Sequence, residues 1–364
     1  PSKKNHEMNS FLSLHLIGSK KLGGAERWFF RFTQALNEFG YPTEIGVRQK
    51  SELVGSKLTN LIRHQLPFAS VWDPISKNAI KKLILRREPQ VVQTYMGRAS
   101  RLTRLPQKSK ILHVARLGGY YKIDGYRHAH AWIGNTKGVC EYLINQGLPR
   151  ERVFHISNFV DIPFNDGQDK VLEFRRQLGL HIDDLVMLTP GRFIPVKGHA
   201  SLIEAFAQLS ESIHGRRLYL ILLGDGNLAE SLRSKSRQCG VDKRVIWPGW
   251  QSDPGPYYQL ADIIVFPSLE GETLGNVILE AWSYKKPVVC TEFRGAMEIT
   301  SHGQDVWRVP CKDAHALASG IHRVLSDPEL KKEMVENGFD KVCRKFSKKH
   351  ILAQHIELYH HLLS

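Results

Sequence analysis

The chain has 364 residues and a formal net charge of +15, with 51 lysines and arginines against 36 aspartates and glutamates. This length favours two domains over a single hydrophobic core, and the composition is that of a globular protein. No apolar run reaches the ~18 residues that a membrane-spanning helix needs, which excludes an integral protein of that type.

The positive charge is confined to the N-terminal half. Residues 1–165 contain 26 basic and 11 acidic residues, a net of +15, whereas residues 166–364 contain 25 of each. This asymmetry predicts an anionic partner for the first half, either a membrane surface, a phosphorylated acceptor or nucleic acid. A solvated basic surface without a partner is the alternative.

The cysteines and the first residues bear on the compartment. Five cysteines, at positions 140, 239, 290, 311 and 343, are scattered and lack the spacing of metal-binding pairs. They are typical of ordinary thiols in a reducing environment. The segment Pro1–Met8 is polar and charged and has no signal-peptide core. These features predict a cytoplasmic protein.

The first elements along the chain indicate the opening of an α/β domain. A strand is predicted at Phe11–Ile17, a glycine-rich loop at Gly18–Arg27 and an apolar helix at Trp28–Phe39. The loop does not match the G-x-G-x-x-G fingerprint, so no nicotinamide or flavin site is predicted. Further predicted strands are Thr43–Val47, Val91–Tyr95, Ile111–Ala115 and Ala131–Gly134, with helical runs between several of them.

A short polar stretch, Asp166–Lys170, is the predicted hinge between an N-terminal domain of residues 1–165 and a C-terminal domain of residues 166–346. In the second half, strands rich in Val, Ile and Leu alternate with helices, which favours a parallel sheet covered on both faces. These strands are Leu185–Thr189, Leu218–Leu223, Val245–Trp247, Ile263–Pro267 and Pro287–Thr291. Glycines 191, 224, 249 and 271 follow strands, at the edge where open parallel sheets bind ligands. A final helix is predicted at about residues 347–364.

Two glutamates flank a predicted helix start. Glu272 precedes a helix that begins near Gly275, and Glu280 lies more than one turn inside it. A helix N-terminus suits a phosphate, and flanking carboxylates suit sugar hydroxyls. Taken alone, the pair favours a plainer interpretation, one exposed loop glutamate and one glutamate on a solvated helix face. The other motifs reverse that preference.

Two cations follow the first strand of the second half. Arg192 and Lys197 lie in the segment Gly191–Gly198, which a tight loop folds back at the ligand edge. They can hold a diphosphate, Arg192 by its fork and Lys197 as a point charge. Such fixed cations would stabilise the charge that grows on a departing nucleoside diphosphate. The chain has no Asp-x-Asp pair, the usual holder of a metal-bound diphosphate, so neither a metal nor another cofactor is predicted.

Together these motifs resemble the donor half of glycosyltransferase family 4, in particular the enzymes that build bacterial lipopolysaccharide and other cell-surface glycans. The resemblance covers most of residues 150–345 and rests on residues 191–198, 222–228, 248–250 and 262–298. Gly23–Glu26 and Asn158–Asp161 support it more loosely. It implies the GT-B fold, with two Rossmann-like α/β domains facing a cleft and a final helix that crosses back to the first domain. It also implies a hexosyltransferase that retains the anomeric configuration.

The resemblance implies a role for each matching residue. Arg192 and Lys197 would hold the donor diphosphate, Glu272 would contact the donor sugar, and Glu280 would contact the ribose. The other implied donor-binding positions are Gly23, Gly24, Gly191, Gly224, Gly249, Trp250, Leu274, Gly275, Asn276 and Val277. Among them, Gly249 and Trp250 would lie beside the nucleobase.

The sequence departs from the family pattern at one position. Many members carry a histidine just after a strand of the first domain, near the 6-hydroxyl of the donor sugar. Here His113 falls inside the predicted strand, where a lone histidine is more typical of a packed core. Arg116 lies nearer the expected place and is the predicted cleft contact, with His113 as the alternative.

In the implied fold the first domain binds the acceptor, so its charge predicts an anionic glycan or a lipid-linked acceptor such as a lipopolysaccharide core. The apolar and basic segment Ile75–Arg87 indicates a helix that rests on anionic lipid at the cytoplasmic face of the inner membrane. An ordinary amphipathic helix is the alternative. The donor nucleotide stays open among UDP, the family's commonest choice, GDP and ADP.

No aspartate or glutamate is placed as a covalent nucleophile, so a front-face mechanism assisted by the leaving phosphate is expected. Two other functions compete with glycosyl transfer. One is a different enzyme of the same architecture, such as a sugar-nucleotide epimerase or a phosphorylase. The other is a basic nucleic-acid-binding protein, but the chain lacks the aromatic platform or motif that such proteins carry, so no nucleic-acid partner is expected.

Overall fold

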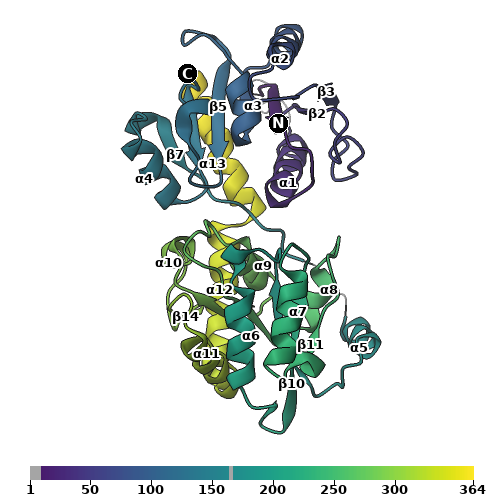
Figure 1. Ribbon diagram of the computed structural model, residues 1–364. Helices are drawn as coiled ribbons and strands as arrows, with labels where there is room; N and C mark the ends of the chain where they lie inside the picture. The colour runs from purple at the N-terminus through teal and green to yellow at the C-terminus, as the bar shows by residue number, and fades with distance from the viewer. Residues whose placement is uncertain (1–9, 164–166) are drawn as a thin grey trace. The chain divides into compact units, whose positions relative to one another are not determined.

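A computed structural model describes residues 10–163 and 167–364. The chain divides into two compact units. Unit 1 comprises the described residues up to Asn158 together with Lys348–Ser364, and unit 2 comprises Phe159–Ser347. Each unit contains a parallel sheet with helices packed on it (Figure 1). The division between the units, at Asn158–Phe159, lies N-terminal to the boundary predicted at residue 165. The segment Pro1–Met8 lies outside the described residues.

The polar stretch predicted as the hinge is not where the chain leaves unit 1. Asp166 lies outside the described residues, and Lys170 already belongs to helix α5 (Gln168–Gln177). The connection is earlier, at Asn158–Phe159. There Val160 N donates to Phe346 O at 3.1 Å, so the outgoing segment is hydrogen-bonded to the segment that leads into the final helix.

The sheet of unit 1 has seven parallel strands in the order β3-β2-β1-β4-β5-β6-β7. The strands are β1 (Ser13–Ile17), β2 (Thr43–Arg48), β3 (Arg63–Leu66), β4 (Val91–Tyr95), β5 (Leu112–Leu117), β6 (Ala131–Gly134) and β7 (Val153–His155). The helices are α1 (Gly24–Glu38), α2 (Pro74–Arg87), α3 (Met96–Leu102), α4 (Lys137–Asn145) and α13 (Lys348–Leu363). Strand β3 has the polar sequence Arg-His-Gln-Leu, so apolar patterning did not predict it.

Alternation along the strands of unit 1 assigns its two faces. In β1, Leu14 and Leu16 pack with residues of α2 and α3, whereas His15 faces Phe32 of α1. The same face as His15 is covered by α13, shown in yellow beside the N-terminal helix α1 in Figure 1, because Phe32 also contacts His355. Helices on both faces bury the central strands β1, β4, β5 and β6 completely, as a parallel sheet covered on both sides requires.

The sheet of unit 2 runs in the order β11-β10-β8-β12-β13-β14, and a short strand, β9, pairs antiparallel with β10. The strands are β8 (Leu185–Pro190), β9 (Ser212–Ile213), β10 (Arg216–Leu223), β11 (Val245–Ile246), β12 (Ile263–Phe266), β13 (Val288–Thr291) and β14 (Trp307–Val309). The helices after α5 are α6 (His199–Gln208), α7 (Ala229–Gln238), α8 (Gly255–Leu260), α9 (Asn276–Ser283), α10 (Arg294–Ile299), α11 (Ala314–Ser326) and α12 (Pro328–Lys345).

Two apolar clusters lie on the two faces of this sheet. Val186 and Leu188 of β8 pack with residues of α8, α9 and α12. Leu185 and Met187 of the same strand pack with residues of α6 and α11. The strands predicted from Val, Ile and Leu content are therefore buried on both sides.

Within residues 10–163 and 167–364, none of the helices combines the length and the apolar character that crossing a membrane requires. All five cysteines are free thiols.

Candidate functional site

Unit 2 has a topological switch point between β8 and β12. From β8 the chain goes to β10 and β11 on one side of the sheet, and then to β12, β13 and β14 on the other. The loops after β8 and β12 leave adjacent strand ends in opposite directions, which is where open α/β sheets bind ligands. These two loops, Gly191–Gly198 and Pro267–Gly275, carry half of the predicted site residues of unit 2.

The two loops are in backbone contact. Leu269 N donates to Val196 O at 2.7 Å. Gly198 has a φ of 67°, and a Cβ at this position would lie 1.9 Å from Pro267 O. Only glycine combines this left-handed conformation with so close an approach. Gly198 therefore allows the loop after β8 to lie against the loop after β12.

This contact brings Lys197 to Glu272. Lys197 Nζ donates to Glu272 Oε2, which also accepts a hydrogen bond from Ser268 Oγ at 3.1 Å. Lys197 Nζ lies 5.1 Å from the centroid of the Phe266 ring. The two side chains of the ion pair are 18% and 15% exposed. Because an ammonium has three donors, Lys197 can bind a ligand anion while it stays on Glu272.

Arg192 lies in a different environment from Lys197. Its loop is held to the loop after β10, since Gly191 N donates to Leu223 O at 2.9 Å and Phe193 N donates to Asp225 O at 2.9 Å. The Arg192 side chain is exposed, and among the described residues it makes no hydrogen bond or ion pair. The two predicted cations are therefore not equivalent, since only Lys197 is held by a carboxylate.

Other predicted positions lie at neighbouring strand ends. A Cβ at Gly224, after β10, would lie 2.0 Å from Gly191 O, so any side chain would push these two loops apart. Gly249 follows β11, and the adjacent Trp250 is 58% exposed. An indole this exposed can stack on a planar ligand such as a nucleobase.

Helix α9 begins at the end of the loop that carries Glu272. Gly275 is its N-cap, with a φ of 75°, and it has no side chain to cap the first-turn N–H groups. Leu274 and Gly275 are buried, Asn276 is exposed and Val277 is half-buried. The positive end of the helix dipole lies at this point, which favours an anion.

Tyr258 holds Glu280, on the second turn of α9. Tyr258 Oη donates to Glu280 Oε2 at 2.6 Å, and the Tyr258 ring stacks on Tyr284 with centroids 5.0 Å apart. Burial, and then the charge of Glu280, raise the pKa of the Tyr258 hydroxyl well above its ordinary value. A neutral phenol thus fixes one carboxylate oxygen of Glu280.

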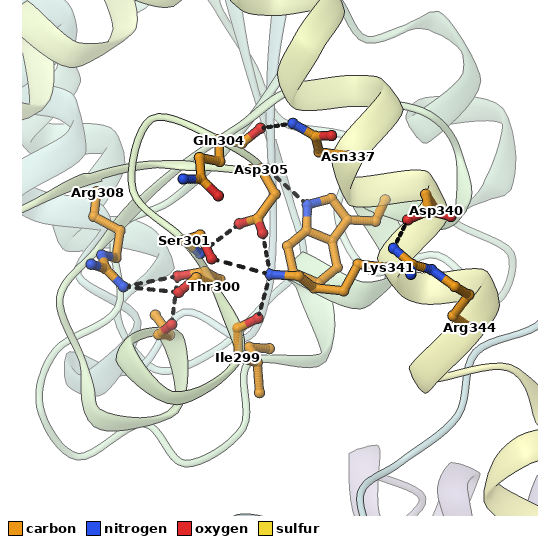
Figure 2. A network of polar contacts seen from close by, with 12 residues as sticks. Ile299, Thr300, Ser301, Gln304, Asp305, Arg308, Asn337, Asp340, Lys341 and Arg344 are labelled. Atoms are coloured by element: carbon orange, nitrogen blue, oxygen red, sulfur yellow. Dashed lines mark hydrogen bonds and ion pairs between the residues drawn. The ribbon is translucent and has the colours of Figure 1, made fainter.

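A polar network anchors the C-terminal end of α9 (Figure 2). Trp282 Nε1 donates to Asp305 O at 3.0 Å, and Lys341 Nζ lies 5.5 Å from the centroid of the Trp282 ring. Lys341, on α12, also donates to the Asp305 carboxylate and to Ile299 O, the latter at 3.2 Å. Since α9 carries Glu280, this network fixes the helix that positions Glu280.

One residue of this region, His199, was missed in the sequence. It begins α6 directly after Gly198, its ring is 2% exposed, and neither ring nitrogen has a hydrogen-bond partner within the described residues. Burial, and then the charge of Lys197, lower its pKa to about 4. Its position at the start of the helix that follows the Lys197 loop could have identified His199 from the sequence as a residue near the site.

In unit 1 the switch point lies between β1 and β4. The glycine-rich loop after β1 leads there into helix α1, whose N-cap is Gly23. Gly23 N donates to Glu26 Oε2 at 2.9 Å, and Gly24 is the first residue of α1. The helix therefore begins before the predicted start at Trp28, because the Gly23–Glu26 contact caps it.

His113 is a packed core residue, as its apolar strand favoured. It is fully buried in β5, and its Nε2 is hydrogen-bonded to Thr94 Oγ1 at 3.0 Å. Burial lowers the pKa of His113 well below its ordinary value. These contacts involve neighbouring strands of the sheet interior.

Arg116 lies inside β5, so the predicted strand end at Ala115 was wrong. The strand continues because Arg116 keeps its parallel pairing with Tyr95 of β4 and Ile133 of β6. Arg116 is only 6% exposed. Its Nη2 donates a hydrogen bond to Asn158 Oδ1 at 2.5 Å. Burial lowers its pKa to about 10.

The sequence model of the family "Glycosyl transferases group 1" matches residues 171–341. The lipopolysaccharide core biosynthesis glycosyltransferase LpsE of Rhizobium meliloti is 31% identical over 345 residues, which are 93% of this chain and 96% of LpsE.

Two solved structures are similar over almost the whole chain. A glycosyltransferase from Rickettsia africae has a TM-score of 0.84 at 20% identity, covering 98% of this chain and 99% of the other. HepE from Anabaena, in complex with UDP and glucose, has a TM-score of 0.82 at 21% identity, covering 96% of this chain and 99% of the other. At such identities the likeness to these structures is one of fold.

Proposed function

Because the chain belongs to the group 1 glycosyl transferases and has the GT-B fold of its structural neighbours, we propose that it transfers a hexose from a nucleoside diphosphate sugar to a glycan acceptor. The transfer proceeds with retention of the anomeric configuration, as in family 4. The expected fold and enzyme class are confirmed by these comparisons, and the donor, the acceptor and the stereochemistry are the proposal.

The observation that carries the proposal is the Lys197–Glu272 pair at the switch point. Lys197 binds the donor diphosphate with its remaining donors, and the N-terminus of α9 adds dipolar stabilisation. Glu272, oriented by Lys197 and Ser268, accepts hydrogen bonds from hydroxyls of the donor sugar. Glu280, oriented by Tyr258, accepts from the ribose hydroxyls.

The chemistry required of these residues is stabilisation of a leaving group. As the glycosidic bond to the diphosphate breaks, negative charge grows on the phosphate oxygens, and Lys197 and Arg192 stabilise it. The acceptor hydroxyl attacks from the face that the diphosphate leaves, and its proton passes to the departing phosphate. Proton NMR of the product linkage tests this route, and an inverted anomer contradicts it.

The preferred donor is a UDP sugar. A structural neighbour, HepE, is described in complex with UDP and glucose, and the exposed indole of Trp250 suits a nucleobase. Thermal stabilisation by UDP, GDP and ADP ranks the nucleotides, and mass spectrometry of the slowly hydrolysed donor then identifies the sugar. A larger stabilisation by GDP or ADP than by UDP would overturn the choice of nucleotide.

Transfer is proposed to need no metal ion. The support is chemical, since the chain has no Asp-x-Asp pair, and in this proposal Arg192, Lys197 and the N-terminus of α9 bear the diphosphate charge instead of a metal. Activity in excess EDTA is expected to equal activity in Mg²⁺ or Mn²⁺. Loss of activity in EDTA that either metal restores contradicts this part of the proposal.

The proposed acceptor is an anionic glycan of the lipopolysaccharide core, bound at the cytoplasmic face of the inner membrane. LpsE, similar over nearly the full length, is named for core biosynthesis. Helix α2 buries Ile80 and Leu83, yet leaves Ile75 and Leu85 exposed by 70% and 63%, and it also exposes Lys77, Lys81 and Lys82. Such a face suits anionic lipid.

Co-sedimentation with vesicles tests the membrane part. Binding to phosphatidylglycerol-containing vesicles is expected to exceed binding to phosphatidylcholine vesicles, and an Ile75→Ser, Leu85→Ser variant is expected to bind less. Equal binding to both vesicle types, or no binding at all, would contradict the proposed membrane association. The assignment as a transferase does not depend on this result.

A further inference from the structure

Arg116 is a buried cation in unit 1 without an anionic partner. Among the described residues no carboxylate forms an ion pair with it, and its Nε is buried without a hydrogen-bond partner. The ionisable side chains around it include Tyr95 and Tyr359, and burial raises the pKa of both phenols, so they carry no negative charge at pH 7. An unpaired buried charge is costly, so it calls for a reason.

Arg175 provides a contrast within the same chain. It is also 6% exposed, but its guanidinium donates to Asp184 O at 2.6 Å and to Leu260 O at 3.3 Å, and it lies 3.6 Å from the Asp262 carboxylate. Arg175 is therefore neutralised by the protein. Arg116 has the neutral amide of Asn158 and the face of Trp28, 4.8 Å from its guanidinium carbon. A cation–π contact offsets only part of the burial penalty.

Two further unsatisfied polar groups lie near Arg116. Asn135 Oδ1 and Ser157 Oγ are buried and have no hydrogen-bond partner within the described residues, and both residues are 5% exposed. Ser157 is the chain neighbour of Asn158, which accepts from Arg116. Asn135 N donates to Leu117 O at 3.2 Å, next to Arg116 in β5.

The sheet explains why these groups gather. Arg116 lies near the carboxyl end of β5, Asn135 directly follows β6, and Ser157 follows β7. The three strands are parallel neighbours, so their carboxyl ends share one edge of the sheet within roughly 10 Å, twice the usual strand spacing. That edge is the ligand-binding edge of an open α/β sheet.

We propose that Arg116, Asn135 and Ser157 form a subsite for a phosphate or carboxylate group of the acceptor saccharide. The inference rests on the proposed function for the identity of the ligand. Arg116 supplies the charge and donors through Nε, and the Ser157 hydroxyl supplies a further donor, while the amide of Asn135 bonds a neighbouring sugar hydroxyl. The +15 charge of residues 1–165 raises the local concentration of such acceptors.

Binding by the full-length protein tests the subsite with glucose 6-phosphate and glucuronate as anionic probes and glucose as the neutral control. Isothermal titration calorimetry is expected to show binding of an anionic probe and none of glucose. Arg116→Met, which keeps the volume over Trp28, is expected to lower the affinity at least about tenfold, and Arg116→Lys less. Equal probe affinity in wild type and Arg116→Met, or no preference for anionic probes, would overturn the proposal.

Stability separates this role from a structural one. Without ligand, Arg116→Met is expected to leave the melting temperature unchanged or raised, because it removes an unpaired buried charge. Arg175→Met, the matched control, is expected to lower it. A loss of stability in Arg116→Met equal to that in Arg175→Met would mean that Arg116 is a structural residue.

The donor is the other possible source of the anion, and UDP titration decides between them. Unchanged UDP affinity in Arg116→Met assigns the subsite to the acceptor. At least a tenfold loss of UDP affinity with unchanged affinity for the anionic sugars assigns Arg116 to the donor diphosphate and overturns the proposal. Failure of the wild-type protein to bind any nucleotide would instead count against the proposed function, since the sugar probes are read independently.

Discussion

Lys197 and Glu272 are 75 positions apart in the sequence, yet they form a largely buried ion pair. Each lies on the loop that follows one of two adjacent parallel strands, β8 and β12, from which the chain departs in opposite directions. The pair therefore marks the ligand-binding edge of unit 2 and links a cation for the diphosphate to a carboxylate for the sugar.

Loss of Lys197 is expected to weaken nucleotide binding. Lys197→Ala, and separately Arg192→Ala, should each weaken UDP binding by about 1.5–3 kcal/mol, the range for hydrogen bonds to charged groups. Isothermal titration calorimetry measures this. Lys235→Ala is the control, because Lys235 pairs with Glu204 between α6 and α7 and should leave UDP affinity unchanged. Unchanged affinity in both site variants would disprove the assignment of Lys197 and Arg192 to the donor diphosphate.

A methyl group at Gly198 is expected to separate the two loops of the site. Gly198 and Gly240 have φ values of 67° and 70°, but a Cβ at Gly198 would meet Pro267 O at 1.9 Å, whereas at Gly240 it would meet open space. Gly240→Ala should cost only the backbone strain, about 1–2 kcal/mol. Gly198→Ala should cost clearly more and abolish detectable UDP binding. Similar stability and similar UDP affinity of the two variants would show that the loops do not need this contact.

The assignment of Glu280 to the ribose can be tested with a nucleotide that lacks the ribose hydroxyls. Wild type should bind UDP more tightly than 2′,3′-dideoxyuridine diphosphate by about 1.5–3 kcal/mol, and Glu280→Ala should remove this difference. Tyr258→Phe, which deletes the 2.6 Å hydrogen bond to Glu280, should reduce it in part. A preference for UDP that survives in Glu280→Ala would place the ribose elsewhere.

Two basic residues on α12 should differ sharply in their effect on stability (Figure 2). Lys341→Met leaves the Asp305 carboxylate, which is 2% exposed, without its cation, and should lower the free energy of unfolding by about 3–5 kcal/mol. Arg344 pairs with Asp340 on the exposed face of the same helix, so Arg344→Met should change it by less than about 1 kcal/mol. Chemical denaturation measures the free energy of unfolding of both variants. Equal losses in the two variants would show that the Lys341–Asp305 network does not stabilise α9.

Unit 1 should lose stability in mild acid. Burial lowers the pKa of His15 and of His355 from 6.5 to about 3 each. Because the folded pKa is the lower one, the unfolded chain takes up protons first, and stability falls as the pH drops from 6.5 towards 3. Each histidine should remove about 2 kcal/mol between pH 7 and pH 5.

Denaturation at pH 7, 6 and 5 checks this loss. The variants His15→Gln and His355→Gln should each show a weaker dependence on pH than the wild type, whatever their stability at pH 7. A wild-type free energy of unfolding that is the same at pH 7 and pH 5 would refute the expectation.

The local pattern of the sequence determined most elements of the fold and much of the candidate site. Continuous apolar runs predicted the buried strands, and the glycine before Asn276 predicted the start of α9 near Glu272. Residues of this kind are predictable because a buried parallel strand and a helix start each depend on only a few neighbours in the chain.

Only the tertiary structure decided which of these residues meet. Lys197 was expected to act with Arg192 of the same loop, and strand order adds Glu272, from a loop 75 positions away, as its ion-pair partner. Likewise the burial of Arg116 next to Asn158, and the unsatisfied His199, follow from strand and helix packing across distant segments. A sequence fixes the periodicity of each element, whereas the partner of a charged side chain depends on the order of strands in the sheet, which no local pattern encodes.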